Sequence, residues 1–189
     1  MRQCMKTVDK FRIRVFRGST TDSDFRSFNN KEAPLRLSAI IIARHPEYDL
    51  GSGSLTPQGI ERANDLAMQI TDKIPSISGV EHAIIVTSTA KRTAEAADIL
   101  SHALGIPVEQ SNVFLTDAFT VENIPAAINF IEAKQDDYDV IIIVTHLEYT
   151  DVLPRACGHA FFGGRARGLR NLRKGEAFIV QRDKATLLR

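Results

Sequence analysis

The sequence predicts an α/β fold in which a mostly parallel central sheet lies between two layers of helices. Three continuous apolar runs, rich in β-branched residues, are typical of strands that are covered on both faces. They span residues 37–43, 83–88 and 139–145. Helical patterns separate the runs, and this alternation favours parallel strands joined by crossover helices. We therefore expect a three-layer α/β/α sandwich.

The segments between the apolar runs contain helix signals. Thr56 followed by Pro57 is a typical helix start, because threonine caps the first turn and proline needs no hydrogen bond there. Apolar residues then recur at helical spacing, at Ile60, Ala63, Ala67 and Ile70. The alanine-rich stretch 88–105 ends on Gly105, a common helix stop. A third helix is expected within residues 121–135.

The rest of the chain is divided into an extension and one compact domain. With 189 residues, of which 43% are hydrophobic, the chain is long enough for one well-packed core. Residues 174–182 are interpreted as a further strand at the edge of the sheet. The polar stretch 18–34 is typical of a loop, so we expect residues 1–37 to form an N-terminal extension. The alternating run 11–16 within this extension is compatible with an added edge strand. We expect residues 38–189 to form the functional domain.

Charge and cysteine content argue against several classes of protein. The 24 Lys plus Arg balance 23 Asp plus Glu, so the net charge gives no global reason to expect binding to nucleic acid or to an anionic membrane, and any basic function must be local. Cys4 and Cys157 are far apart, which predicts neither a disulfide framework nor a zinc site. No apolar stretch has the length of a signal peptide or a membrane span. We expect a cytoplasmic protein.

Arginines and histidines follow the ends of the apolar runs. Arg44 and His45 end the first run, Arg92 lies one helical turn beyond the second, and His146 follows the third. Because ligand sites in open α/β sheets form beyond the carboxyl ends of the strands, we expect these side chains to converge on one crevice. Two guanidinium groups and an imidazole would bind an anion, and the other imidazole would be a nucleophile. The pattern favours a phosphoryl group as ligand.

Two further segments contain polar groups that could contact such a ligand. Ser52 and Ser54 lie in the loop after His45, where they could donate to phosphate, although a flexible Gly/Ser linker has the same composition. The basic run within residues 155–174 is typical of a solvated face, and the alternative is recognition of an acidic substrate or a nucleic-acid backbone.

Four motifs resemble those of the histidine phosphatase superfamily, which includes the cofactor-dependent phosphoglycerate mutases. Arg-His-Pro-Glu at 44–47 resembles the family's Arg-His-Gly-Glu, and "SLTPQGIERA" resembles its Leu-Thr-x-x-Gly-x-x-Gln-Ala. "TSTAKRTAEAADIL" resembles Ser-Ser-Pro-x-x-Arg-Ala-x-Gln-Thr-Ala, and "VTHLEYTDVL" contains the second histidine. The motifs occur in family order over residues 38–180. The short segment between Arg92 and His146 is most similar to the bacterial phosphohistidine phosphatase branch.

The resemblance implies a role for each of these residues. His45 would attack phosphorus and become a phosphohistidine, while Arg44, Arg92 and His146 would bind the equatorial oxygens. Water would then hydrolyse the intermediate, and no metal or cofactor would be required. This mechanism favours a neutral His45 and a more readily protonated His146.

The resemblance leaves the general acid and the substrate open. Relatives in this branch often place a carboxylate before the third helix, which points to Asp117, and Glu148 is the competing candidate. The alternative is that both have an ordinary surface role and neither is the acid. We expect a phosphatase that acts on a phosphorylated small molecule or a phosphoprotein. The alternative is a catalytically weak relative that binds phosphorylated ligands. A mutase-type phosphotransferase is less favoured, because mutases usually carry longer insertions.

Overall fold

A computed structural model describes the chain from residue 36 to residue 189, with gaps at 75–76, 78–81, 117–118, 121, 165–168 and 183. The alternating run 11–16 and almost all of the predicted extension 1–37 lie outside the described residues, as does Asp117. Within the described ranges, no helix combines the length and the apolar character needed to span a membrane.

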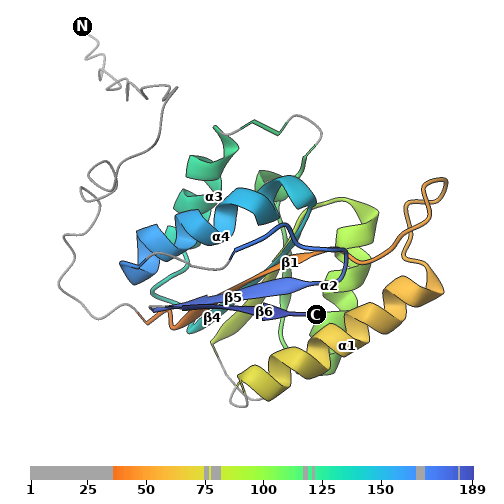
Figure 1. The fold of residues 1–189 in the computed structure, drawn as a ribbon, viewed down its shortest axis with the longest axis horizontal. Coiled ribbons are helices and arrows are strands. Elements are labelled where there is room, and N and C mark those ends of the chain that lie inside the picture. The colour runs from red at the N-terminus through yellow and green to blue at the C-terminus, as the bar shows by residue number, and fades with distance from the viewer. Residues whose placement is uncertain are drawn as a thin grey trace, which may run out of the picture. The chain divides into compact units, whose positions relative to one another are not determined.

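Strands and helices alternate along the described chain, as the apolar runs predict (Figure 1). Their bounds are β1 Ala39–Arg44, α1 Pro57–Lys73, β2 Ala83–Thr87, α2 Lys91–Leu104, β3 Val108–Gln110, the short 3-10 helix η3 Asn112–Phe114, α3 Asn123–Glu132, β4 Val140–Thr145, α4 Leu147–Phe162, β5 Ala177–Gln181 and β6 Lys184–Leu188. The strands β1, β2 and β4 correspond to the three apolar runs. The sequence patterns did not predict β3, α4 and β6.

The predicted helix signals are confirmed at the start of α1 and at the end of α2. The Thr56 side chain accepts a hydrogen bond from the Gly59 amide and caps α1, and Gly105 ends α2 with a φ of 71°. The predicted apolar stripe of α1 is buried except at its start, where Ile60 is 46% exposed. Gly59, rather than Ile60, is the buried residue in the first turn of this helix.

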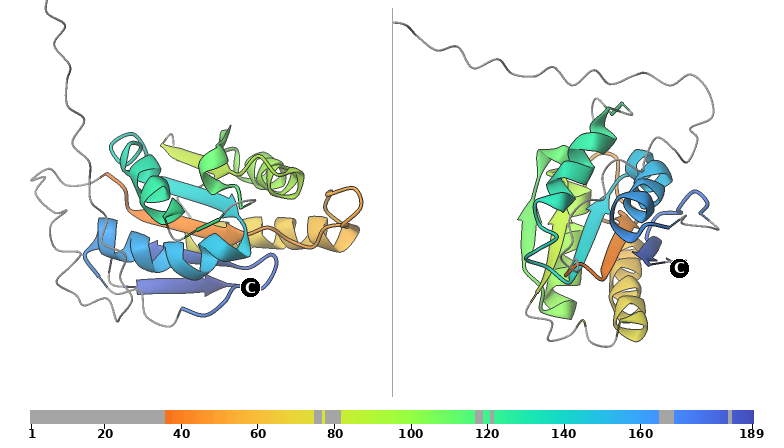
Figure 2. Two further views of the ribbon diagram at one scale, coloured as in Figure 1. Left: turned by 90° about the horizontal axis from the view of Figure 1, so that it is seen from above. Right: turned by 90° about the vertical axis from the view of Figure 1, so that its left-hand side faces the viewer.

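The six strands form one sheet in the order β3-β2-β4-β1-β5-β6. Strands β3, β2, β4 and β1 run parallel, whereas β5 is antiparallel to both of its neighbours, so the predicted mostly parallel sheet is confirmed. The view from above in Figure 2 shows β1, in orange, beside β4, in cyan. The predicted edge position of residues 174–182 is wrong. Strand β5 is hydrogen-bonded on both sides and mostly buried, and β6 lies at that edge.

Helices cover both faces of the sheet. Successive side chains of a strand point to opposite faces, and in these strands both sets are apolar and need to be buried. Ile41, Ile85 and Ile142 pack with α1 and α2 on one face. Their neighbours Ile40 and Ile141 pack with α3 and α4 on the other. Figure 1 views the sheet nearly edge-on, with α3 and α4 above it and α1 below. Each fully buried isoleucine contributes roughly 1.5–3 kcal/mol to folding, so these layers hold the carboxyl ends of the strands in place.

The register of the parallel strands brings three turns together. Arg44, the last residue of β1, pairs with Thr145 of β4, and Thr87 of β2 pairs with Val144. Backbone hydrogen bonds continue past the strands, since the His45 amide donates to the Thr145 carbonyl at 3.0 Å. The chain leaving β1, which we call the β1–α1 loop (residues 45–56), therefore starts beside the turns that follow β2 and β4.

Candidate active site

His45, Arg92 and His146 converge beyond the carboxyl ends of β1, β2 and β4. His45 begins the β1–α1 loop, Arg92 lies in the first turn of α2, and His146 is the N-cap residue of α4. The two imidazole rings have their centroids 5.3 Å apart, and both residues are buried. The guanidinium group of Arg92 donates to both rings. The predicted convergence of these side chains is therefore present in the structure.

The hydrogen bonds of His45 select one tautomer of its ring. Nδ1 lies 2.8 Å from the carbonyl oxygen of Pro46, and a carbonyl oxygen can only accept. Nδ1 therefore carries the proton, and the lone pair is on Nε2, which accepts from Arg92 Nε at 3.3 Å. Burial lowers the pKa of His45 to about 4, helped by the positive charges of Arg92, Arg44 and Lys174 and opposed by the Pro46 hydrogen bond. At neutral pH the ring is neutral.

His146 is held in the opposite tautomer. Arg92 Nη2 can only donate, so Nδ1 of His146, 3.0 Å away, is the acceptor and the ring proton is on Nε2. Nε2 donates to Ser88 Oγ at 2.9 Å. Ser88 Oγ lies 2.7 Å from Thr93 Oγ1, which donates to the Ala90 carbonyl at 2.7 Å. This buried chain of hydroxyl groups fixes the orientation of the ring.

The expectation of a more readily protonated His146 is wrong for the site as the structure has it. Burial, together with the neighbouring charges of Arg92, His45 and Arg44, lowers the pKa of His146 to about 3. Both imidazoles are therefore neutral at neutral pH. The physical reason is that the ring is buried beside two guanidinium groups, which the sequence alone does not reveal.

Arg44 adds a second guanidinium group next to the two rings. Its Nη1 donates to the Leu172 carbonyl at 2.8 Å, and its positive charge lowers the pKa of both histidines. Its Nε is buried and has no hydrogen-bond partner among the described residues. Buried donors are normally paired in folded proteins. The unpaired donor of Arg44 is thus suited to an anionic ligand.

Tyr48 and Ser88 are site residues that the sequence analysis did not single out, and Lys174 entered it only as the last residue of the basic run 155–174. The Tyr48 ring lies edge-on to His45, with centroids 5.1 Å apart. The guanidinium carbon of Arg92 and Nζ of Lys174 lie 4.7 Å and 4.8 Å from the centroid of this ring. The available signals were positional: Tyr48 follows His45 by three residues, Ser88 ends the second apolar run, and Lys174 precedes the last strand.

Other predicted residues make contacts outside this cluster or lie outside the described part of the chain. Ser52 is exposed, its amide donates to Asp49 Oδ1 at 2.7 Å, and its Oγ accepts from the Ser54 amide at 3.3 Å. Asp117 is not among the described residues, so the structure does not test it. Glu148 is exposed in the first turn of α4.

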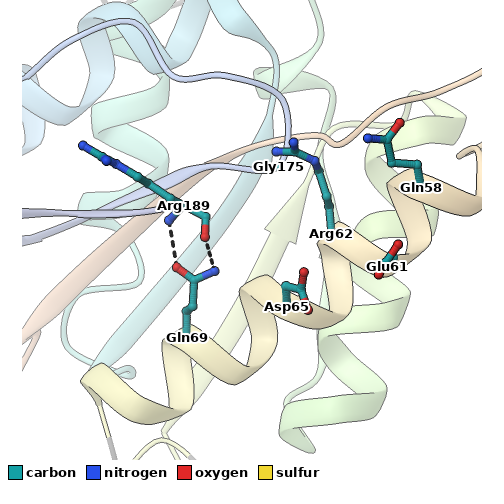
Figure 3. Close-up of a pocket in the computed structure, with 7 residues that line it drawn as sticks. All are labelled: Gln58, Glu61, Arg62, Asp65, Gln69, Gly175 and Arg189. Carbon is teal, nitrogen blue, oxygen red and sulfur yellow. Dashed lines mark hydrogen bonds between the residues drawn. The ribbon is translucent and has the colours of Figure 1, made fainter.

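A separate surface pocket of about 300 Å³ lies along α1 and shares no residue with the histidine cluster. Its lining residues are Gln58, Glu61, Arg62, Asp65, Gln69, Gly175 and Arg189 (Figure 3). Within it, the Gln69 amide exchanges two hydrogen bonds with the backbone of Arg189. Among the described residues, no group of three or more His, Cys, Asp or Glu side chains could hold a metal ion.

Comparisons with known proteins give matches at the level of structure. No family model and no curated protein matches the sequence. The protein histidine phosphatase SixA complexed with tungstate matches with a TM-score of 0.61 and 14% identity, covering 80% of this chain and 94% of that chain. Bacillus stearothermophilus YhfR matches with a TM-score of 0.55 and 18% identity, over 79% and 94% of the two chains.

A mycobacterial glucosyl-3-phosphoglycerate phosphatase also matches, with a TM-score of 0.52 and 12% identity over 80% of this chain and 97% of that chain. At such low identities the likeness shows a shared fold. The expected resemblance is therefore confirmed at the level of the fold, and one matched protein was solved in complex with tungstate, an oxyanion.

Proposed function

We propose that this chain is a histidine phosphatase that hydrolyses a phosphorylated small molecule or a phosphoprotein through a phosphohistidine intermediate on His45. The observation that carries the proposal is the sharing of one guanidinium group by two neutral imidazoles. Arg92 donates to Nε2 of His45 at 3.3 Å and to Nδ1 of His146 at 3.0 Å. A phosphoryl group that enters between these three groups meets a nucleophile and a cationic donor at once.

The tautomer of His45 supports its role as the nucleophile. The Pro46 carbonyl holds the proton on Nδ1, which leaves the Nε2 lone pair for attack. The low pKa of about 4 keeps that lone pair available at neutral pH. When Nε2 becomes bonded to phosphorus the ring gains positive charge, and the same carbonyl stabilises the Nδ1 proton.

Arg44, Arg92 and His146 would balance the negative charge of the phosphoryl group. The two arginines stay charged at any relevant pH, and their planar groups suit phosphate oxygens. A bound dianion favours the protonated form of His146, so its pKa rises on binding and it becomes a third donor. This change would restore the protonation that the resemblance implies for the second histidine.

The reaction would proceed in two steps, transfer of the phosphoryl group to His45 and hydrolysis of the phosphohistidine. In the first, Nε2 of His45 forms a bond to phosphorus, the ester P–O bond breaks, and the leaving oxygen takes a proton. In the second, water attacks phosphorus, the N–P bond breaks, its electron pair returns to Nε2, and inorganic phosphate leaves. Asp117 and Glu148 remain the two candidates for the proton donor of the first step.

The test is to trap the intermediate. Rapid acid-free quenching with a phosphomonoester labelled on phosphorus should give a labelled protein that is stable to base and labile to acid. His45→Ala should abolish both the label and the turnover of an aryl phosphate. His102→Ala, which removes an exposed histidine of α2, is the matched control and should retain both. Label that persists in His45→Ala would overturn the assignment.

The same experiment separates the phosphatase from the binding-only alternative. A binding protein would take up phosphate or vanadate, measured by calorimetry, and yet show neither label nor turnover. Pro46 favours the binding-only alternative, because it stands where the family has glycine and has no amide N–H to donate to an anion.

A further inference from the structure

Lys174 brings a third positive charge to the candidate active site. Its Nζ lies 4.8 Å from the centroid of the Tyr48 ring, and that ring lies 5.1 Å from the ring of His45. An ammonium group at this distance is attracted by the negative face of an aromatic ring. The side chain is therefore held at the Tyr48 side of the site, where its charge acts on His45.

The backbone of Lys174 is fixed to the end of β1, the strand that directly precedes His45. Residues 173–176 form a tight turn, in which the amide of the last residue donates to the carbonyl of the first at 3.1 Å. Gly175 has a φ of 75°, a conformation that favours glycine, and its amide donates to the Arg44 carbonyl at 3.2 Å. Arg62 Nη1 donates to the Lys174 carbonyl at 3.3 Å. The lysine thus projects from an anchored turn.

Positive charge in the site exceeds what one phosphoryl group can balance. Within the described part of the chain, no carboxylate forms an ion pair with Arg44, Arg92 or Lys174. Arg44 donates to a carbonyl, Arg92 to two imidazoles, and Lys174 contacts an aromatic ring. A phosphomonoester carries at most about two negative charges at neutral pH. One of the three cations is left without a counter-charge.

Lys174 is the cation placed to meet a second group of the ligand. Arg92 hydrogen-bonds both imidazoles and so faces the position of the transferred phosphoryl group. The ammonium of Lys174 lies over Tyr48, as Arg92 does, but within the described part of the chain it has no hydrogen bond to either imidazole, and its flexible stem can follow a ligand group beside the phosphate. We propose that Lys174 binds a second anionic group of the substrate, so that the site prefers phosphomonoesters with a carboxylate or another phosphate near the scissile phosphate. This inference rests on the proposed phosphatase function.

A matched pair of substrates tests the preference. Meta-carboxyphenyl phosphate and meta-carbamoylphenyl phosphate have nearly the same shape and differ by one negative charge. We expect kcat/KM of the unaltered protein to favour the carboxylate, and Lys174→Met to reduce that preference by at least about fivefold, mainly through KM. Comparing the ratio between variants cancels the difference in leaving-group reactivity. Lys174→Arg should keep most of the preference.

The control variant is Lys73→Met, which removes the same charge from the exposed end of α1 and should leave the ratio unchanged. If Lys174→Met slows both substrates equally, the lysine serves the transferred phosphoryl group and the specificity proposal is wrong, although the phosphatase proposal stands.

The preference can also be measured without turnover. Meta-carboxy- and meta-carbamoyl-benzylphosphonate cannot be hydrolysed, and calorimetry gives their dissociation constants for the same set of variants. Tighter binding of the carboxylate that is lost in Lys174→Met supports the inference, and equal affinities in the unaltered protein overturn it. Absence of turnover with either aryl phosphate would instead contradict the proposed function.

Discussion

At the scale of single residues, one arginine determines the tautomer and the charge of the site. Arg92 is a permanent donor, so both ring nitrogens that face it must be acceptors. His45 and His146 place their protons on the far sides of their rings, toward the Pro46 carbonyl and Ser88. Burial and the positive charge of Arg92 both oppose protonation of either ring. The site is thus positive through its arginines and uncharged at its imidazoles.

The titration of the two histidines tests this description. In NMR spectra of the ligand-free protein, the ring of His45 should protonate near pH 4 and that of His146 near pH 3, below the ordinary value of 6.5. Saturating phosphate should raise the pKa of His146, because an adjacent anion stabilises the imidazolium. Arg92→Met should raise it as well, since it removes a neighbouring positive charge. A midpoint above pH 6 for either ring without phosphate would contradict the description.

At the scale of elements, the start of α1 packs directly on the loop that carries the nucleophile. The Glu47 carbonyl accepts from the Thr56 amide at 3.0 Å, and Thr56 caps the helix through Gly59. A Cβ atom at residue 59 would lie 2.1 Å from the Glu47 carbonyl oxygen. Only glycine lets helix and loop approach this closely, so the position of His45 depends on the first turn of α1.

Gly59→Ala should therefore destabilise the protein, although alanine is the better helix former by about 1 kcal/mol. The clash with backbone must be relieved by moving the loop, at a cost of roughly 1–3 kcal/mol in the free energy of unfolding. Urea denaturation measures this change, and aryl phosphate turnover should fall as His45 shifts. Asn64→Ala, on the exposed face of the same helix, should be neutral or stabilising. Stabilisation by both substitutions would show that the loop moves at no cost.

At the scale of the whole molecule, the parallel sheet assembles the site by bringing the ends of distant strands to one edge. The polar groups gathered there are buried between α2, α4 and the β1–α1 loop, and this burial has a cost that depends on pH. Above pH 6.5, His45 is neutral in the folded and the unfolded chain and contributes no pH dependence. As pH falls from 6.5 toward 4, the unfolded chain takes up a proton that the folded chain does not, so stability is lost.

The acid sensitivity of His45→Gln tests this linkage. By about pH 5 the histidine should have cost the unaltered protein up to about 2 kcal/mol relative to neutral pH, and the variant should be spared that loss. Urea denaturation at both pH values gives the two free energies of unfolding. His102→Gln, on the exposed face of α2, is the control and should lose as much stability as the unaltered protein. Identical acid sensitivity in His45→Gln would mean that the ring titrates alike in both states.

The sequence by itself determined the strands β1, β2 and β4, the start of α1, the end of α2 and the gathering of His45, Arg92 and His146. These features depend on local patterns: a continuous apolar run, a threonine before a proline, a terminal glycine, and polar residues directly after a strand. The helix α4 was not predicted, because Pro154 within it lowers helix propensity and its burial against the sheet compensates.

Only the tertiary structure decided the position of β5 inside the sheet, the inclusion of Tyr48 and Lys174 in the site, and the low pKa of His146. Each depends on contacts between segments far apart in sequence, such as the hydrogen bond from Gly175 to Arg44. Burial and the field of neighbouring charges arise when distant segments pack together, and no local pattern of residues encodes their magnitude. For this reason the sequence identifies which groups meet at the strand ends, whereas packing sets their protonation and the excess of positive charge around them.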